Sequence, residues 1–243
     1  MSLALWGAAA AAGYLAGSVS FTRIVTRLVR PGQPLQQAEV PVEGTDMVYK
    51  VTTTGATAAS MQLGARAGCA IGLLDMLKAA IPVLLFRILY PDELYLLAAA
   101  VAAMAGHNWP VFHRFQGGRG ISAYYGGLLV IDWVGALVTA AVGMLAGFLV
   151  VKDFFVAYMA GLWLLIPWMA ILTGRWEYVV YAVIVNILYT VAMLPDIRQY
   201  TTIKKTTSVD PKAVLETNPM GRGMLKISEW IQKTLPGRNK KRR

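Results

Sequence analysis

The sequence predicts an all-α, polytopic membrane protein with about seven transmembrane helices. Of its 243 residues, 56% are hydrophobic and only 15% are charged, whereas soluble domains carry about 25% charged residues. The mean hydropathy is +0.51. Because a helix rises 1.5 Å per residue and the hydrocarbon core is about 30 Å thick, a span needs roughly 20 apolar residues. The predicted spans cover about residues 3–27, 67–89, 94–107, 121–131, 134–151, 154–172 and 178–194.

Basic residues are distributed unevenly among the connectors between these spans. Cytoplasmic connectors are enriched in Lys and Arg, so we place the amino terminus outside and the carboxyl terminus in the cytoplasm. An odd number of spans agrees with this split. The basic connectors are residues 28–66, the loop with Arg114 and Arg119, Lys152, and the tail from Arg198.

Two regions are expected along the chain. Residues 1–198 form the transmembrane bundle, and residues 199–243 form a basic cytoplasmic tail. An uneven apolar stripe around Trp230 predicts an amphipathic helix on the inner leaflet. A solvated chain end is the alternative interpretation of the tail.

Composition argues against several functional classes. The single cysteine, Cys69, allows neither an intramolecular disulfide nor a cysteine metal cage. Two histidines without an HExxH pattern make a zinc site unlikely by motif, so we expect no metal. The net charge of +10 is explained by positive-inside topology and attraction to anionic membrane lipid, so no nucleic-acid partner is expected.

The most informative polar segment is residues 106–120, between the third and fourth predicted spans. Gly117, Gly118, Arg119 and Gly120 immediately precede the fourth span. Glycines let backbone N–H groups turn toward one point, and a helix amino terminus adds further donors and a positive dipole end. An arginine supplies a planar donor fork suited to phosphate. The segment predicts an anion site at membrane depth; a tight reentrant turn with a headgroup-contacting arginine is the alternative.

A second small-residue segment precedes the second predicted span. Thr52, Thr53, Gly55 and Thr57 place hydroxyls and a glycine at a helix amino terminus. This pattern suits an anion. Ordinary helix capping is the simpler interpretation of the same residues.

Two further polar features interrupt apolar runs. Asp75 and Lys78 lie three residues apart, on one face of a predicted helix. Charges inside a membrane run usually face the bundle interior, where they form a structural ion pair or part of a site. Ser18, within residues 17–20, breaks the first run, and such small residues favour close helix packing.

These motifs, in this order, resemble the acyl-phosphate-dependent glycerol-3-phosphate acyltransferases, which are bacterial seven-helix membrane enzymes. The specific match is the loop at residues 106–120, which resembles the family's GHxxPvfxxFxGGKG with Arg119 at the lysine position. The resemblance covers about residues 10–200. Weaker matches in the expected order are residues 14–21 with YLxGSxPF, 55–57 with GATN, 63–68 with LGxxAG and 73–78 with LLDxLKG.

The resemblance implies transfer of an acyl group from acyl phosphate to glycerol 3-phosphate, giving lysophosphatidic acid and phosphate in the bacterial inner membrane. The mixed anhydride is already activated, so the site supplies phosphate pockets, orientation and oxyanion stabilisation. No cofactor and no oligomeric state are implied. The implied catalytic residues are Arg119, His107 and Thr53, and the implied substrate-binding residues are Ser18, Thr52, Gly55, Thr57, Asn108, Gly117, Gly118, Gly120 and Asp196.

The chain departs from the family pattern in the second motif. The family's GSGNxGATN falls on residues 50–58, where Val51 replaces the serine, and Thr53 and Ala58 replace the asparagines. The family also has an arginine after this motif, and Met61 stands at that position here. Capture of phosphate through this segment is therefore weakened, with threonine hydroxyls as the substitutes.

A second departure lies near the end of the last predicted span. The family's HRxNI falls on residues 193–197, which places Asp196 at an asparagine position. A carboxylate would repel a phosphate unless it were protonated or paired, for which Arg198 is one candidate partner. Two alternatives follow: a non-catalytic lipid- or phosphate-binding protein on the same fold, and an acyltransferase with another acceptor.

Overall fold

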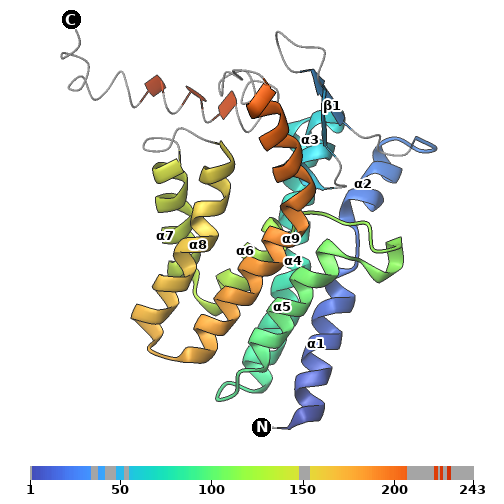
Figure 1. Ribbon diagram of the computed structural model, residues 1–243. Helices are drawn as coiled ribbons and strands as arrows, with labels where there is room; N and C mark the ends of the chain where they lie inside the picture. Colours follow the sequence, from blue (N-terminus) through green and yellow to red (C-terminus); the bar gives the residue numbers. More distant parts are fainter. Residues whose placement is uncertain are drawn as a thin grey trace, which may run out of the picture.

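The computed structural model describes residues 2–33, 38–41, 48–51, 55–147, 154–206, 222–223, 225–226 and 229–230. These residues form a bundle of helices with one small β-hairpin beside it (Figure 1). The helices are α1 Leu3–Gly17, α2 Phe21–Val29, α3 Ala56–Leu63, α4 Ala65–Leu89, α5 Tyr95–Asn108, η1 Val111–His113, α6 Ile121–Ile131, α7 Trp133–Leu145, α8 Phe154–Thr173 and α9 Trp176–Thr206. The strands are β1 Ala38–Pro41 and β2 Val48–Val51.

The predicted helical membrane architecture is confirmed. A helix occupies each of the predicted apolar runs, and three stretches are long and apolar enough to cross a membrane: Leu3–Val29, Ala65–Leu89 and Trp176–Thr202. Shorter apolar helices occupy Ile121–Ile131, Trp133–Leu145 and Met159–Thr173. The number of spans and the orientation of the termini stay predictions.

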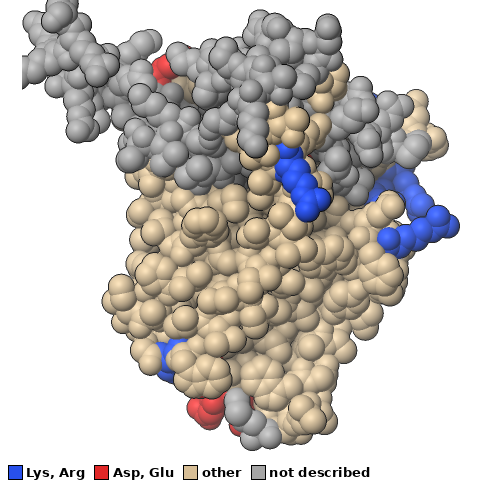
Figure 2. Space-filling view, in the orientation of Figure 1, with Lys and Arg blue, Asp and Glu red and all other residues tan. Residues whose placement is uncertain are grey.

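The face of the molecule seen in Figure 2 has a middle region without charged residues. Figure 2 shows a broad band without Lys, Arg, Asp or Glu on the visible face, with charged residues toward the two ends. In Figure 1, α1 begins at the lower end of the bundle and α9 ends at the upper end. A band of this kind is what a bundle surrounded by hydrocarbon requires.

The hairpin was not predicted from the sequence. Its strands pair antiparallel, with Ala38 opposite Val51 and Pro41 opposite Val48. The Gln199 side-chain amide on α9 donates a hydrogen bond to the Val48 carbonyl at 3.3 Å, which joins the hairpin to the bundle. Strands of four residues carry little periodic signal, so this polar segment offered no pattern to recognise.

The first predicted span is two helices separated by a break at residues 18–20. The Ser18 hydroxyl donates to the Tyr14 carbonyl at 2.8 Å, and Ser20 accepts from the Arg23 backbone N–H at 3.5 Å as the N-cap of α2. Serine side chains compete with the helix ladder in this way and favour helix ends. The break places the Val19 carbonyl where it accepts a hydrogen bond from Lys78 on α4.

Glycines bring α1 and α5 into close contact. A Cβ on Gly17 would lie 2.1 Å from the Ala103 carbonyl oxygen, and one on Gly106 would lie 2.2 Å from that of Tyr14. Only glycine permits this backbone approach, as is common between membrane helices. The contact fixes Ser18 beside the segment that follows α5.

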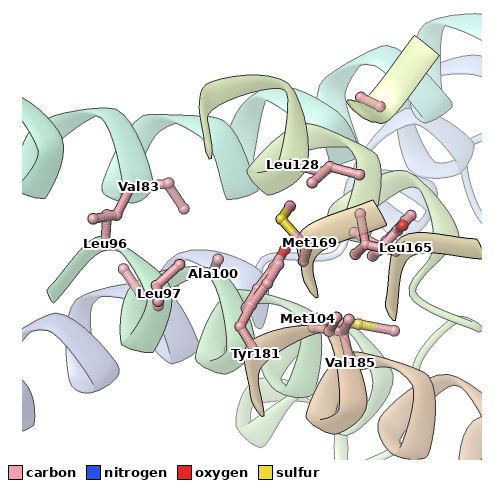
Figure 3. Close-up of a cluster of buried hydrophobic side chains, with 14 of the residues drawn as sticks. Val83, Leu96, Leu97, Ala100, Met104, Leu128, Leu165, Met169, Tyr181 and Val185 are labelled. Atoms are coloured by element: carbon pink, nitrogen blue, oxygen red, sulfur yellow. The ribbon is translucent and has the colours of Figure 1, made fainter. Parts of the chain in front are cut away.

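The core lies between α4, α5, α6, α8 and α9. Figure 3 shows their side chains meeting in one cluster, and all of the labelled ones are buried. Close packing of this kind resists movement of one helix against another. The labelled residues are Val83, Leu96, Leu97, Ala100, Met104, Leu128, Leu165, Met169, Tyr181 and Val185.

Candidate functional site

The glycine-rich loop connects the end of α5 to the start of α6. After η1, Arg114 and Phe115 turn the chain with positive φ angles of 52° and 59°. The Gly118 backbone N–H then donates to the His107 carbonyl at 3.1 Å, which folds the loop back against the end of α5. Gly120, with φ of 84°, is the N-cap of α6. The loop therefore delivers its backbone to a helix amino terminus, as predicted.

Close contacts explain why this loop needs glycines. A Cβ on Gly117 would lie 2.1 Å from the His107 carbonyl oxygen, and one on Gly118 would lie 2.2 Å from His107 Nε2. A Cβ on Gly120 would lie 2.3 Å from Asn108 Oδ1. His107 and Asn108 are both buried. These two side chains therefore act as the surface on which the loop is shaped.

A small cleft of about 10 Å³ lies on one side of the loop. Its walls come from the α1–α2 break at residues 17–20, from Asp75 and Lys78 on α4, from His107, and from residues 117–118. The structure thus gathers residues from three stretches that the sequence had singled out: residues 17–20, Asp75 with Lys78, and the segment 106–120. A cleft of this size has room for about one water molecule, so it marks the point at which these polar residues meet.

The polar residues of the cleft form one connected group. Lys78 Nζ lies 2.8 Å from Asp75 Oδ1 and donates to the Val19 carbonyl at 2.6 Å. The carbonyl belongs to the α1–α2 break, so the ion pair ties α4 to this break. His107 Nδ1 lies 3.7 Å from Asp75 Oδ1 and has no hydrogen-bond partner among the described residues. The ion pair is thus structural and also part of the cleft wall.

Ser18 completes this wall from α1. Its side chain is fully buried, and its hydroxyl accepts a 3.4 Å hydrogen bond from the Val111 backbone N–H. Val111 begins η1, so Ser18 anchors the segment that leads into the glycine-rich loop. Ser18 therefore lies in the close helix packing that the sequence predicted, and it also lines the cleft.

Arg119 lies on the other side of the loop, against α9. Its Nε donates to Asp196 Oδ2 at 3.0 Å and its Nη2 donates to Asp196 Oδ1 at 2.7 Å. The Asp196 side chain is fully buried, and that of Arg119 is 22% exposed. Neither residue lines the cleft. The carboxylate that the sequence analysis expected to need a partner therefore has one in Arg119.

Two residues of the second motif, Gly55 and Thr57, lie away from the cleft. Gly55 is the N-cap of α3, and the Thr57 side chain is exposed. Neither residue lines the cleft. The predicted contacts of Thr52 and Thr53 lie outside the described residues.

Arg23 is a residue near the loop that the sequence analysis missed. Its Nη2 donates to the Gln116 carbonyl at 3.2 Å, and its buried Nε has no hydrogen-bond partner among the described residues. Burial lowers the pKa of the His113 side chain, and the positive charges of Arg23 and Arg27 lower it further. His113 is therefore neutral at pH 7. The available signal was the position of Arg23 three residues after Ser20, in the first turn of a helix.

Fold and site together define an integral membrane protein with a glycine-rich loop held at a helix amino terminus inside the bundle. The sequence model of the family described as "Glycerol-3-phosphate acyltransferase" matches residues 7–206. The chain belongs to this family, which confirms the resemblance found in the sequence.

Individual relatives match over part of their length. The chain is 35% identical to a glycerol-3-phosphate acyltransferase of Photorhabdus laumondii over 121 residues, which are 49% of this chain and 50% of that protein. It is 36% identical to one of Myxococcus xanthus over 131 residues, which are 54% of this chain and 62% of that protein. The chain thus spans about half the length of these curated relatives.

Solved structures confirm the fold over most of the chain. The crystal structure of PlsY (YgiH), an integral membrane glycerol 3-phosphate acyltransferase, in its glycerol 3-phosphate form matches with a TM-score of 0.67 at 23% identity. The match covers 81% of this chain and 92% of that one. Its lysophosphatidic acid form matches with a TM-score of 0.66 at 22% identity, over the same shares.

Proposed function

We propose that the protein transfers an acyl group from acyl phosphate to glycerol 3-phosphate, giving lysophosphatidic acid and phosphate. The observation that carries this proposal is the glycine-rich loop, which is folded onto His107 and Asn108 and ends at the amino terminus of α6. Membership of the family supports the reaction class. The structural similarity to PlsY in its glycerol 3-phosphate form supports the acceptor.

The reaction needs positioning more than chemical activation by the protein. The acceptor hydroxyl attacks the carbonyl carbon of the mixed anhydride, an ester bond forms, and the bond from that carbon to the phosphate oxygen breaks. Phosphate leaves with the electron pair. Backbone N–H groups at a helix amino terminus stabilise the oxyanion and the departing phosphate. No metal or covalent enzyme intermediate is required for these steps.

His107 is the candidate to take the proton of the attacking hydroxyl. Its side chain is 9% exposed, lines the cleft, and directs Nδ1 toward Asp75 at 3.7 Å. A neighbouring carboxylate stabilises the imidazolium that forms when the ring accepts a proton. Lys78, paired with the same carboxylate, keeps Asp75 in place.

Arg119 is the candidate phosphate ligand of the acceptor. It stands at the end of the glycine-rich loop, and its side chain is 22% exposed. The planar donor fork of an arginine suits phosphate oxygens. Ser18 and Asn108 hold the loop from its two sides, and Thr52, Thr53 and Thr57 are proposed as additional hydroxyl contacts.

The same proposal assigns a place in the cell. We place the bundle of residues 1–198 in the bacterial inner membrane, with the amino terminus outside. Residues 199–243 then form a basic cytoplasmic region, which anionic lipid attracts. This orientation puts the basic connector before α3 and the loop after α5 on the cytoplasmic face, where soluble glycerol 3-phosphate is available.

One observation favours a second candidate function. Asp196 already occupies Arg119 with two hydrogen bonds, and Val51, Ala58 and Met61 remove polar groups from the second motif. A protein with these changes could bind lipid or phosphate without turnover, or acylate a different alcohol. Retained phosphate binding without turnover would identify the non-catalytic form.

The proposal is tested by phosphate release from palmitoyl phosphate. The purified protein in lipid is assayed with and without glycerol 3-phosphate, and palmitoyl-CoA replaces the donor in a parallel reaction. Acceptor-dependent release of phosphate supports the proposed reaction. Release no faster than hydrolysis of the donor in empty lipid would reject it, and formation of product from palmitoyl-CoA alone would reject the proposed donor.

A further inference from the structure

Two residues at the entrance to the glycine-rich loop adopt a backbone conformation that non-glycine residues seldom adopt. Arg114 and Phe115 have φ angles of 52° and 59°, and both are exposed. A left-handed backbone at such residues persists only where the surrounding structure holds it. The Gln116 N–H donates to the His113 carbonyl at 3.0 Å. This bond fixes the N–H side of the turn, but not the carbonyl that leads on to Gly117.

Arg23 holds this carbonyl from outside the loop. Its Nη2 donates to the Gln116 carbonyl oxygen at 3.2 Å, and no other group in the described part of the chain donates to this oxygen. The Arg23 side chain is half-buried, and its Nε is withdrawn from water. A hydrogen bond from a charged donor is stronger than one between neutral groups. The contact is therefore suited to holding the turn in place.

The helix that carries Arg23 is itself fixed to the bundle. Thr22 and Thr26 of α2 are buried. Just before α2 begins, the Val19 carbonyl accepts a hydrogen bond from Lys78 on α4. In Figure 1 the segment after α5 extends beneath α2. Arg23 therefore reaches the loop from a helix whose position is set by its contacts with the bundle.

We propose that Arg23 is a positioning residue, which holds the glycine-rich loop in the conformation that the acyl transfer uses. The proposal rests on the proposed function, because it takes this loop and the amino terminus of α6 as the site of reaction. Arg23 does not line the cleft, so it acts through the loop. A displacement of Gln116 passes to Gly117, which lies against the His107 carbonyl, and so reaches the candidate catalytic side chain.

A matched control for Arg23→Met is available in Arg27→Met, one helical turn later on α2. Both substitutions remove one positive charge near the loop. Burial lowers the pKa of the His113 side chain, and both arginines lower it further. Arg27 is exposed and makes no hydrogen bond to the described loop residues. The two variants therefore separate the contact of Arg23 with the loop from the charge that both arginines share.

Hydrogen exchange of the folded protein in lipid, without substrates, gives the first readout. The amides of Phe115, Gln116 and Gly118 are hydrogen-bonded to carbonyls of residues 107–113. In Arg23→Met these amides should exchange about tenfold faster, because the loop opens more often once its carbonyl is released. Arg27→Met should exchange like the original chain. Unchanged exchange in the loop of Arg23→Met, or an equal increase throughout α4 and α5, would overturn the proposal.

Turnover gives the second readout, at a temperature at which all variants stay folded. In Arg23→Met, the kcat of acceptor-dependent phosphate release should fall about tenfold, because a displaced loop stabilises the transition state less well. The KM for glycerol 3-phosphate should change less than about twofold, since Arg23 does not bind the substrate. A raised KM with unchanged kcat would contradict positioning and assign Arg23 to substrate binding.

Failure of this proposal can be told apart from failure of the proposed function. If the original chain shows no acceptor-dependent release, the proposed function fails, and hydrogen exchange still decides whether Arg23 holds the loop. Faster exchange confined to the loop sustains that role, and unchanged exchange overturns it. If Arg23→Met does not fold, Arg23→Gln, with a shorter side chain, is measured against Arg27→Gln with the same expected results.

Discussion

The two sides of the glycine-rich loop use charged residues in different ways. On the cleft side, Asp75 and Lys78 are one helical turn apart, and Lys78 also holds the carbonyl of Val19. On the α9 side, Arg119 and Asp196 are 77 residues apart and join two elements directly. The first pair joins α4 to the α1–α2 break beside the cleft, whereas the second joins the glycine-rich loop to α9. The two ion pairs thus hold the loop's surroundings from different sides.

Removing the cation on the α9 side should have the largest effect on turnover. In Arg119→Ala, we expect acceptor-dependent phosphate release to fall by about 10³-fold, because a preorganised charge on the phosphate is lost. The substitution also leaves Asp196 buried without this partner, so the thermal midpoint should fall. The control Arg175→Ala removes an exposed arginine from a surface pair with Glu177 and should change neither quantity.

Adding Asp196→Asn to Arg119→Ala separates the two effects. The double variant should regain most of the lost thermal stability, since no unpaired carboxylate remains, but it should stay inactive. Recovery of turnover in the double variant would show that Arg119 acts only as a partner of Asp196.

Breaking the pair on the cleft side should chiefly destabilise the bundle. Lys78→Met leaves the buried Asp75 carboxylate without its lysine and the Val19 carbonyl without its donor. We expect a loss of about 3–5 kcal/mol in the free energy of unfolding. Reversible unfolding in detergent measures this loss. The double variant Asp75→Asn/Lys78→Met should lose clearly less, and equal losses for both would contradict a buried ion pair.

How much of the molecule could be predicted from sequence depends on the range of each interaction. The apolar helices follow from composition, and Asp75 with Lys78 follows from helical spacing, because both signals are local. Contact between Arg119 and Asp196 depends on how α9 packs against the loop, which no local pattern encodes. Arg198 was suggested as a partner because it is close in sequence.

The glycine-rich loop could be predicted only in part. Its residues and its place before a helix were evident from the sequence, but the contacts of Gly118 with His107 are tertiary. The hairpin gave too little signal, because strands of four residues show no clear period. Arg23 lies near the end of the first predicted span, where its contact with the Gln116 carbonyl is tertiary. Thr53, at a motif position, lies outside the described residues and stays a prediction.

Gly118→Ala tests whether the shape of the loop matters for chemistry. The new Cβ would meet His107 Nε2 at 2.2 Å, so the loop and the ring must separate. A displacement near 1 Å costs about 10²-fold in rate at a reaction centre. Gly7→Ala, where the added Cβ has no neighbour within 4 Å, is the matched control. Unchanged turnover in Gly118→Ala would place the reaction elsewhere.

The smallest effect is expected at Ser18. Ser18→Ala removes the hydroxyl that accepts from the Val111 N–H, and should cost about 1 kcal/mol in the free energy of unfolding. Thermal unfolding checks this against Thr190→Ala, whose hydroxyl donates only to the Asn186 carbonyl one turn earlier. A loss no larger than that of the control would remove Ser18 from the anchoring of the loop.

Detection of the product tests the central claim most directly. The purified protein in lipid is incubated with palmitoyl phosphate and ¹³C-labelled glycerol 3-phosphate, and the lipids are analysed by mass spectrometry. The account predicts labelled lysophosphatidic acid from the original chain and none above background from the Arg119→Ala/Asp196→Asn variant. Absence of labelled product from a folded original chain, or equal product from both proteins, would contradict it.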